Sequence, residues 1–114
     1  AALRSPRDAD LLADFADALA MARGQSLQGP PEELVRRALE IDPKNMKALA
    51  LAGTAAFDRR DFNAAAAYWK QMLEHAQPGS EDERIIRQSI DEALALANAR
   101  PLTGTVRLAA SLTD

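Results

Sequence analysis

The sequence predicts an all-α protein in which antiparallel helix pairs stack into a short solenoid of five helices, followed by an irregular or strand-like tail. Alanine accounts for 25 of the 114 residues, whereas aromatic residues make up only 4%. A core of such small side chains requires elements that approach closely, which favours helices. Apolar residues recur at three- and four-residue spacing over five segments, and prolines and glycines fall almost entirely between these segments.

The first two predicted helices span residues 8–22 and 31–41. In the first, apolar residues three and four apart lie on one face, and acidic residues near its start suit the positive end of a helix. The second begins at a proline and ends at Asp42-Pro43, because a residue before proline disfavours helical backbone. The apolar stripes are Leu11, Leu12, Phe15, Leu19 and Ala22 in the first helix and Leu34, Val35, Ala38, Leu39 and Ile41 in the second.

The third and fourth helices are predicted at about residues 44–59 and 61–76. The third is apolar or small nearly all round, so it needs neighbours on more than one side. Asp61 is the expected N-cap of the fourth. The buried stripe of the fourth helix is expected to be Phe62, Ala65, Ala66, Trp69, Met72, Leu73 and Ala76.

The fifth helix is predicted to open with Ser80 and Glu83, which have the spacing of a capping box, and to run to about Asn98. Its inward residues are expected to be Ile86, Ile90, Ala93, Leu94 and Ala97. After Pro101 the alternating, β-branched residues 103–108 indicate an unpaired strand that is too short to fold alone. A disordered terminus is an equally good interpretation of this tail.

The composition disfavours several function classes. There is no cysteine, so the chain holds no disulfide, thiolate zinc site or cysteine nucleophile. The single histidine, His75, leaves too few groups for a metal site or a catalytic set. A net charge of −3 and a pI near 5.1 argue against nucleic-acid binding. No apolar run reaches the ~18 residues of a membrane span. We therefore expect no enzyme activity, no cofactor, no metal, no nucleic acid and no membrane contact by these residues.

A repeating pattern links the predicted helices. Pro6, Pro43 and Pro78 lie 37 and 35 residues apart. When Met46 is counted as the first position, the pattern places Leu49 at four, Gly53 at eight, Phe62 at seventeen, Ala65 at twenty and Trp69 at twenty-four. This resembles the 34-residue tetratricopeptide repeat (TPR), in which these positions are bulky, small, bulky, alanine and aromatic.

Gly53 makes this resemblance specific, because glycine inside a helix costs ~1 kcal/mol relative to alanine. We expect the helix that carries Ala65 to approach Gly53 closely. Arg60 departs from the pattern, since the repeat favours glycine in this turn. The preceding unit fits more loosely, with three extra residues in its loop. The predicted organisation is a remnant of an upstream repeat over 1–7, a TPR-like repeat over 8–43, a TPR repeat over 44–78, a capping helix over 79–99, and a tail over 100–114 that begins a missing β-rich segment.

A narrower resemblance lies in the amino-acid sequence of residues 8–20, 38–57 and 67–73, followed by Pro78-Gly-Ser-Glu. These segments resemble the periplasmic TPR region of cytochrome c maturation proteins of the CcmI/CycH type. The resemblance implies an apocytochrome c chaperone, whose TPRs hold the C-terminal helix of the haem-free cytochrome for the haem-ligation machinery. It also implies a periplasmic location, tethered to the inner membrane by a segment outside this sequence.

In stacked TPRs, the first helix of each repeat lines a concave groove through positions two, five, nine, twelve and thirteen. The predicted peptide-binding groove is therefore Asp10, Ala13, Asp17, Ala20 and Met21 in one repeat and Lys47, Ala50, Thr54, Phe57 and Asp58 in the other. These residues give a floor of small side chains with acidic surroundings, which suits an amphipathic helix with basic flanks. The alternative is a scaffolding TPR subunit of a haem lyase or other envelope complex, with no ligand in the groove.

Overall fold

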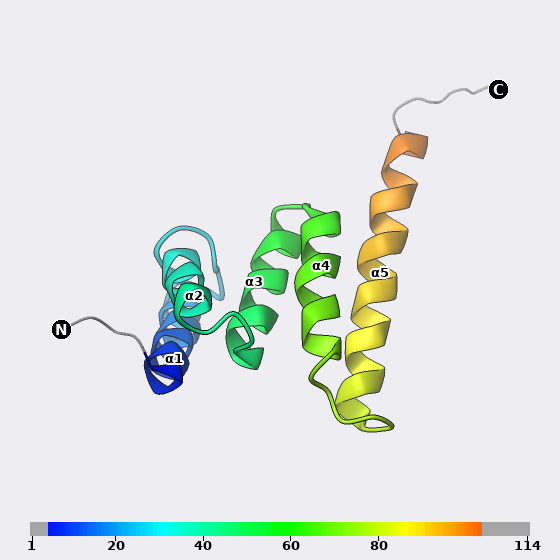
Figure 1. Ribbon diagram of the computed structural model, residues 1–114. Helices are drawn as coiled ribbons and strands as arrows, with labels where there is room; N and C mark the ends of the chain where they lie inside the picture. The colour runs from blue at the N-terminus through cyan, green and yellow to red at the C-terminus, as the bar shows by residue number, and fades with distance from the viewer. Residues whose placement is uncertain (1–4, 104–114) are drawn as a thin grey trace.

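The computed structural model describes residues 5–103, with side chains described as far as residue 99 (Figure 1). Over this range the chain forms five α-helices and no strand, which confirms the predicted all-α class. The helices are α1 (Pro6–Ala22), α2 (Pro30–Ile41), α3 (Met46–Asp58), α4 (Phe62–Leu73) and α5 (Glu81–Thr103). Each packs mainly against its neighbours in the chain, so the helices follow one another in space from α1 to α5, as in a short helical solenoid.

The helices begin where a polar side chain accepts hydrogen bonds from the first N–H groups, or where proline leaves no N–H group to satisfy. Ser5 caps α1 in a capping box with Asp8, whose backbone N–H donates to the serine hydroxyl at 3.3 Å. Asn45 caps α3, and the predicted cap Asp61 is confirmed for α4, where its carboxylate accepts from the N–H of residue 64 at 3.3 Å. The proline pair at the start of α2 needs no such acceptor, because proline has no N–H group.

One of the two hydrogen bonds of the expected capping box is present at the start of α5. The Ser80 hydroxyl accepts a hydrogen bond from the backbone N–H of Glu83 at 3.1 Å, as expected. The Glu83 carboxylate, however, accepts from the N–H of Gly79 at 2.8 Å rather than from that of Ser80. This N–H and the Arg87 guanidinium lower the pKa of the Glu83 carboxyl below its ordinary value of 4.5.

The other end of α5 differs from the prediction. The helix continues to Thr103, so the first four residues assigned to an irregular or strand-like tail are helical. Pro101 does not end the helix, because the fixed φ of proline is itself close to the helical value and only one backbone donor is lost. The remainder of the predicted tail, 104–114, lies outside the described residues.

Three clusters of buried side chains hold the helices together, and α3 contributes to each of them; the smallest is Ala20, Leu27 and Ala55. The first cluster joins α1, α2 and α3 through Ala9, Leu12, Ala13, Ala16, Val35, Ala38, Ala48 and Ala52. The second joins α3, α4 and α5 through Ala56, Phe62, Ala65, Ala66, Ile86, Ile90 and Ala93. The expectation that the third helix has neighbours on several sides is thereby confirmed.

The apolar stripe predicted on the first helix is only partly buried. Leu12 belongs to the first cluster, but Leu11 and Phe15 are 58% and 57% exposed. The buried face of α1 is instead made mostly of alanines, and the exposed larger residues lie on another face of the helix. Small side chains face α2 and α3 because they let the helix axes approach closely, and this leaves the larger ones outside.

The close approach expected at Gly53 is present. A Cβ added to this glycine would lie well inside 3.0 Å of the Trp69 indole ring of α4. Trp69 also packs against Phe57, with ring centroids 5.8 Å apart. The helix that carries Ala65 therefore makes the predicted contact, and it does so with its tryptophan.

Arg60 stands where the tetratricopeptide pattern favours glycine, and its backbone has the conformation that glycine adopts. Its φ is 68°, in the left-handed region that glycine adopts without strain. The backbone of the turn between α3 and α4 thus keeps the glycine geometry although the residue is an arginine. Gln25, in the loop between α1 and α2, has the same φ of 68°.

Candidate functional site

The predicted groove residues of α1 and α3 occupy different environments. Ala13 is fully buried in the first cluster, so it has no surface left for a ligand. Ala20 is also buried. The exposed members are Asp10, Met21, Lys47, Thr54 and Asp58, and the half-buried ones are Asp17, Ala50 and Phe57.

Between α1 and α3, the charged groove residues are paired with one another. The Lys47 ammonium lies 2.9 Å from the Asp14 carboxylate and 3.2 Å from that of Asp17. These two hydrogen-bonded carboxylates raise the pKa of Lys47 above its ordinary value of 10.5. The Asn45 amide donates to the Asp10 carboxylate at 2.5 Å. The acidic face of α1 is therefore linked to α3 by ion pairs that remain exposed to solvent.

Phe57 belongs mainly to the second cluster. Its ring meets that of Phe62 edge to face, with centroids 5.1 Å apart, as well as that of Trp69. Such aromatic pairs stabilise a fold beyond the area that they bury. The part of Phe57 that is still exposed is available to a ligand only along the edge of this aromatic group.

A hollow opens between α3 and α5, and we call it the α3–α5 pocket. Its volume is about 340 Å³. It is lined by Met46, Lys47, Ala50, Met72, Asp82, Ile85 and Ile86. The structure thus brings two predicted groove residues, Lys47 and Ala50, together with residues of α5 and the end of α4 that the sequence analysis did not assign to the groove.

The repeat spacing contains the signal for these missed residues. In α5, the buried residues Ile86, Ile90 and Ala93 follow Ala48, Ala52 and Ala55 of α3 by 38 residues, and all six are buried. The same shift applied to the groove positions Lys47, Thr54 and Asp58 gives Ile85, Glu92 and Leu96. Ile85 and Leu96 are 47% and 38% exposed. The fifth helix was predicted only as a capping helix, so Ile85 was not expected to line a pocket.

The chemistry of the α3–α5 pocket is that of an apolar binding surface. Methionine, alanine and isoleucine side chains make most of its lining, and methionine adapts readily to different partners. Asp82 contributes the charge at its edge that has no ion-pair partner among the described residues, whereas Lys47 is engaged by two carboxylates. The arrangement fits an amphipathic helix that inserts apolar side chains and carries a basic residue beside them.

Residues 5–103 contain neither a cluster of metal-ligating side chains nor a membrane-spanning helix. No group of three or more His, Cys, Asp or Glu side chains is placed there to hold a metal ion. None of the helices in that range combines the length and the apolar character needed to cross a membrane.

The sequence is similar to curated proteins of one kind. No family model matches it. It is 26% identical over 89 residues to the cytochrome c-type biogenesis protein CcmH of Escherichia coli K12 and, equally, to that of Shigella flexneri. The chain is similar to a cytochrome c-type biogenesis protein. The match covers 78% of this chain and 25% of CcmH, so the chain spans about a quarter of the length of these relatives.

The fold also has a counterpart among solved structures. The crystal structure of the YfrE protein from Vibrio parahaemolyticus superposes on it with a TM-score of 0.63 and a sequence identity of 28%. The match covers 83% of this chain and 99% of the other. The five-helix arrangement is therefore shared with a protein of related sequence.

Proposed function

We propose that the chain is a peptide-binding TPR module of a c-type cytochrome biogenesis protein, and that it holds the C-terminal helix of apocytochrome c for haem ligation. The observation that carries this proposal is the similarity to CcmH over 89 residues. On this proposal the chain is not an enzyme, and its partners are apocytochrome c and the haem-ligation machinery. It works in the periplasm, as part of a protein tethered to the inner membrane.

The α3–α5 pocket supplies a binding mode. Ile85 and Met46 offer apolar surface to one face of a helical peptide, and Ala50 between them leaves room for the peptide backbone to come close. Asp82 is exposed at the edge of this surface, and Asp58 is exposed at the C-terminal end of α3; both attract basic residues on the flanks of the peptide. The α1–α3 side, linked by the Lys47 ion pairs, forms the wall of the site rather than its floor.

Calorimetric titration with the C-terminal helical peptide of an apocytochrome c tests the proposal. We expect saturable binding, which Ile85→Lys weakens by about tenfold or more because a charge replaces a central apolar contact. Leu11→Lys is the matched control, since Leu11 is an exposed apolar residue on α1 outside the pocket. Heat no greater than that of a scrambled peptide would reject the function for this chain.

A scaffolding role is the second candidate, and the exposed Leu11 and Phe15 favour it. Neighbouring exposed apolar side chains on one helix are typical of protein contact surfaces. On this alternative the groove has no ligand, and the chain joins a haem lyase or another envelope complex through α1. Leu11→Lys would then abolish capture of the complex, whereas Ile85→Lys, Asp17→Lys and Phe57→Ala would leave it intact.

A further inference from the structure

A second hollow lies on the other side of α3, between α2 and α4, and we call it the α2–α4 pocket. Its volume is about 490 Å³, larger than that of the α3–α5 pocket. The apolar part of its lining is Val35, Leu39, Pro43, Leu49, Ala52 and Tyr68. None of these residues belongs to the proposed groove, so the groove ligand leaves this pocket empty.

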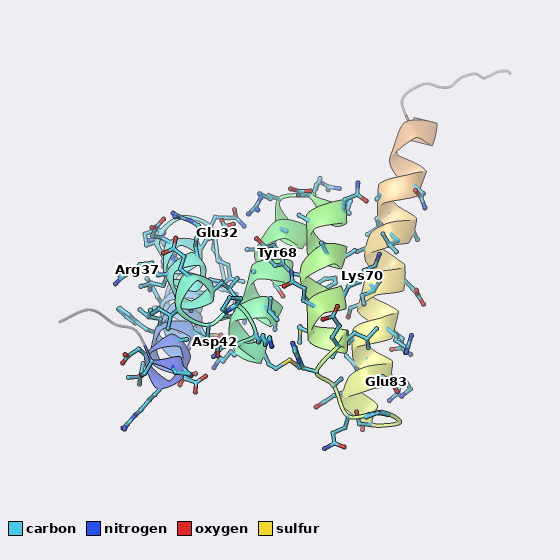
Figure 2. All side chains as sticks on the ribbon, viewed as in Figure 1. Glu32, Arg37, Asp42, Tyr68, Lys70 and Glu83 are labelled. Carbon is cyan, nitrogen blue, oxygen red and sulfur yellow. The ribbon has the colours of Figure 1, made fainter. Side chains whose placement is uncertain are left out.

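Packing of the two helix pairs creates this pocket. α2 and α4 both lie against α3, where Leu49 and the small Ala52 form a low, buried floor. Tyr68 reaches from α4 to the first cluster, which belongs to the other pair, and its position is marked in Figure 2. The pocket therefore depends on the junction of the pairs and is not a feature of either pair alone.

The charged rim is only partly neutralised by the chain itself. Glu32 pairs with Arg59, and Glu33 pairs with Arg36. Glu40 has no ion-pair or hydrogen-bond partner among the described residues. It is the carboxylate at the rim that is free to meet a positive charge from outside.

Two neutral polar groups complete the rim. Among the side chains that the structure describes, neither the Tyr68 hydroxyl nor the Gln71 amide makes a hydrogen bond within the protein. Both lie beside the apolar floor, where a polar group of a ligand can satisfy them. An apolar hollow of several hundred Å³ with a few convergent polar groups is the usual form of a binding site.

We propose that the α2–α4 pocket is a second docking site, which takes a large apolar side chain and an adjacent lysine or arginine of a partner protein. The apolar side chain covers Leu39, Leu49 and the Tyr68 ring, while the cation pairs with Glu40. Tyr68 and Gln71 hydrogen-bond to the partner's backbone. Half-buried tyrosine is a frequent anchor of protein interfaces, because its rigid ring offers both apolar area and a hydroxyl.

This site gives the module two independent faces. Lys47 and Ala50 line the α3–α5 pocket, whereas Leu49 and Ala52 line the α2–α4 pocket on the other side of the same helix. A ligand in one pocket does not block the other. The chain can therefore hold a helical peptide on one side while a basic partner segment binds on the other.

Peptide selection on the whole chain tests the proposal. A random peptide library displayed on phage is panned on the immobilised protein, after depletion on the Tyr68→Ala, Glu40→Lys double variant. We expect enriched peptides that pair a large apolar residue with a nearby lysine or arginine. Calorimetry with the synthetic peptides should then show binding that Glu40→Lys weakens by about tenfold. Tyr68→Phe should weaken it less, because the ring is retained.

Matched variants separate this site from general charge and from the groove. Asp91→Lys makes the same charge reversal on the exposed surface of α5, and Ile85→Lys disables the α3–α5 pocket. Neither should change the affinity of the selected peptides. The proposal is overturned if no peptide is enriched, if the enriched peptides lack a basic residue, or if Asp91→Lys weakens binding as much as Glu40→Lys does.

Discussion

The two helix pairs solve the same packing problem with different side chains. In the first pair, α1 contributes Ala16 and α2 contributes Val35, both fully buried in the first cluster. In the second pair, the corresponding residues are Gly53 of α3 and Trp69 of α4. In the second pair the smallest residue faces the largest, whereas the first pair buries an alanine and a medium-sized valine in one cluster.

Both pairs combine a small residue on one helix with a larger one on the other, in different sizes. Interiors are packed to the density of organic crystals, so a larger side chain on one helix requires a smaller one opposite. The connections differ in the same way. A long loop over residues 23–29 joins the first pair, whereas a turn of three residues, 59–61, joins the second.

The largest effect is expected where the second pair is tightest. In most helices Gly→Ala stabilises by about 1 kcal/mol, because alanine is the better helix former. Here Gly53→Ala drives a methyl group into the Trp69 ring, and we expect a net loss of at least about 2 kcal/mol of unfolding free energy. Urea unfolding followed by circular dichroism measures this loss.

A second substitution, Trp69→Val, should reduce the stability loss caused by Gly53→Ala. Trp69→Val gives the second pair the residue sizes of the first, so Gly53→Ala should cost less in that background than in the wild-type chain. In the first pair Ala16→Gly should cost about 1 kcal/mol, mainly through helix propensity. A neutral or stabilising Gly53→Ala in the wild-type chain would contradict the account of the second pair.

The junction between the pairs should show the next largest effect. Asn45 is the only buried polar residue among those described, and its side chain both caps α3 and donates to Asp10 of α1. Asn45→Ala removes both contacts, and we expect it to lower the unfolding free energy by about 1.5 kcal/mol. Asn45→Asp keeps the cap but places a second carboxylate beside Asp10. Asn45→Asp as stable as the wild type would show that the link to α1 contributes nothing.

The short turn of the second pair should gain from a glycine. Arg60 has a φ of 68°, which costs a non-glycine residue about 1–2 kcal/mol. Arg60→Gly relieves this strain, although the flexible unfolded chain offsets part of the gain, so we expect about 1 kcal/mol more stability. Arg60→Ala removes the charge and keeps the strain, and thermal unfolding should show no gain. A gain from alanine equal to that from glycine would assign the effect to the charge instead.

The smallest effect concerns the start of α5, which closes the second pair. The pKa of Glu83 is lowered in the folded state, so its contribution is present above the ordinary value of 4.5 and is lost as the pH falls through the folded value. We expect Glu83→Gln to make the acid-induced fall of the melting temperature shallower. Parallel pH profiles for the variant and the wild type would show that this carboxylate adds no charge-dependent stability.

Most of the fold follows from local signals in the sequence. Ser80, Asp61 and the proline pair at α2 begin helices because they satisfy or lack the first backbone donors, and such rules need no knowledge of distant residues. Gly53 predicted a close contact because its cost had to be offset by packing. The end of α5 was missed, since Pro101 is tolerated in a last turn and the sequence does not show when.

The site depended on contacts between elements, which local patterns do not contain. Lys47 was predicted as a groove residue, but its pairing with Asp14 and Asp17 requires the distance between α1 and α3. Ile85 was missed because α5 was compared with a cap and not with α3. The α2–α4 pocket arises at the junction of two pairs, so no pattern within one repeat reveals it.

Binding of a helical peptide between α3 and α5 can be mapped on the molecule residue by residue. The measurement is amide chemical-shift mapping of the isotope-labelled chain titrated with the C-terminal helical peptide of an apocytochrome c. We expect the largest shifts around Ala50 and Ile85, with α1 beyond Asp17 little changed. Shifts centred on Leu11 and Phe15, or no shifts at a saturating peptide concentration, would contradict it.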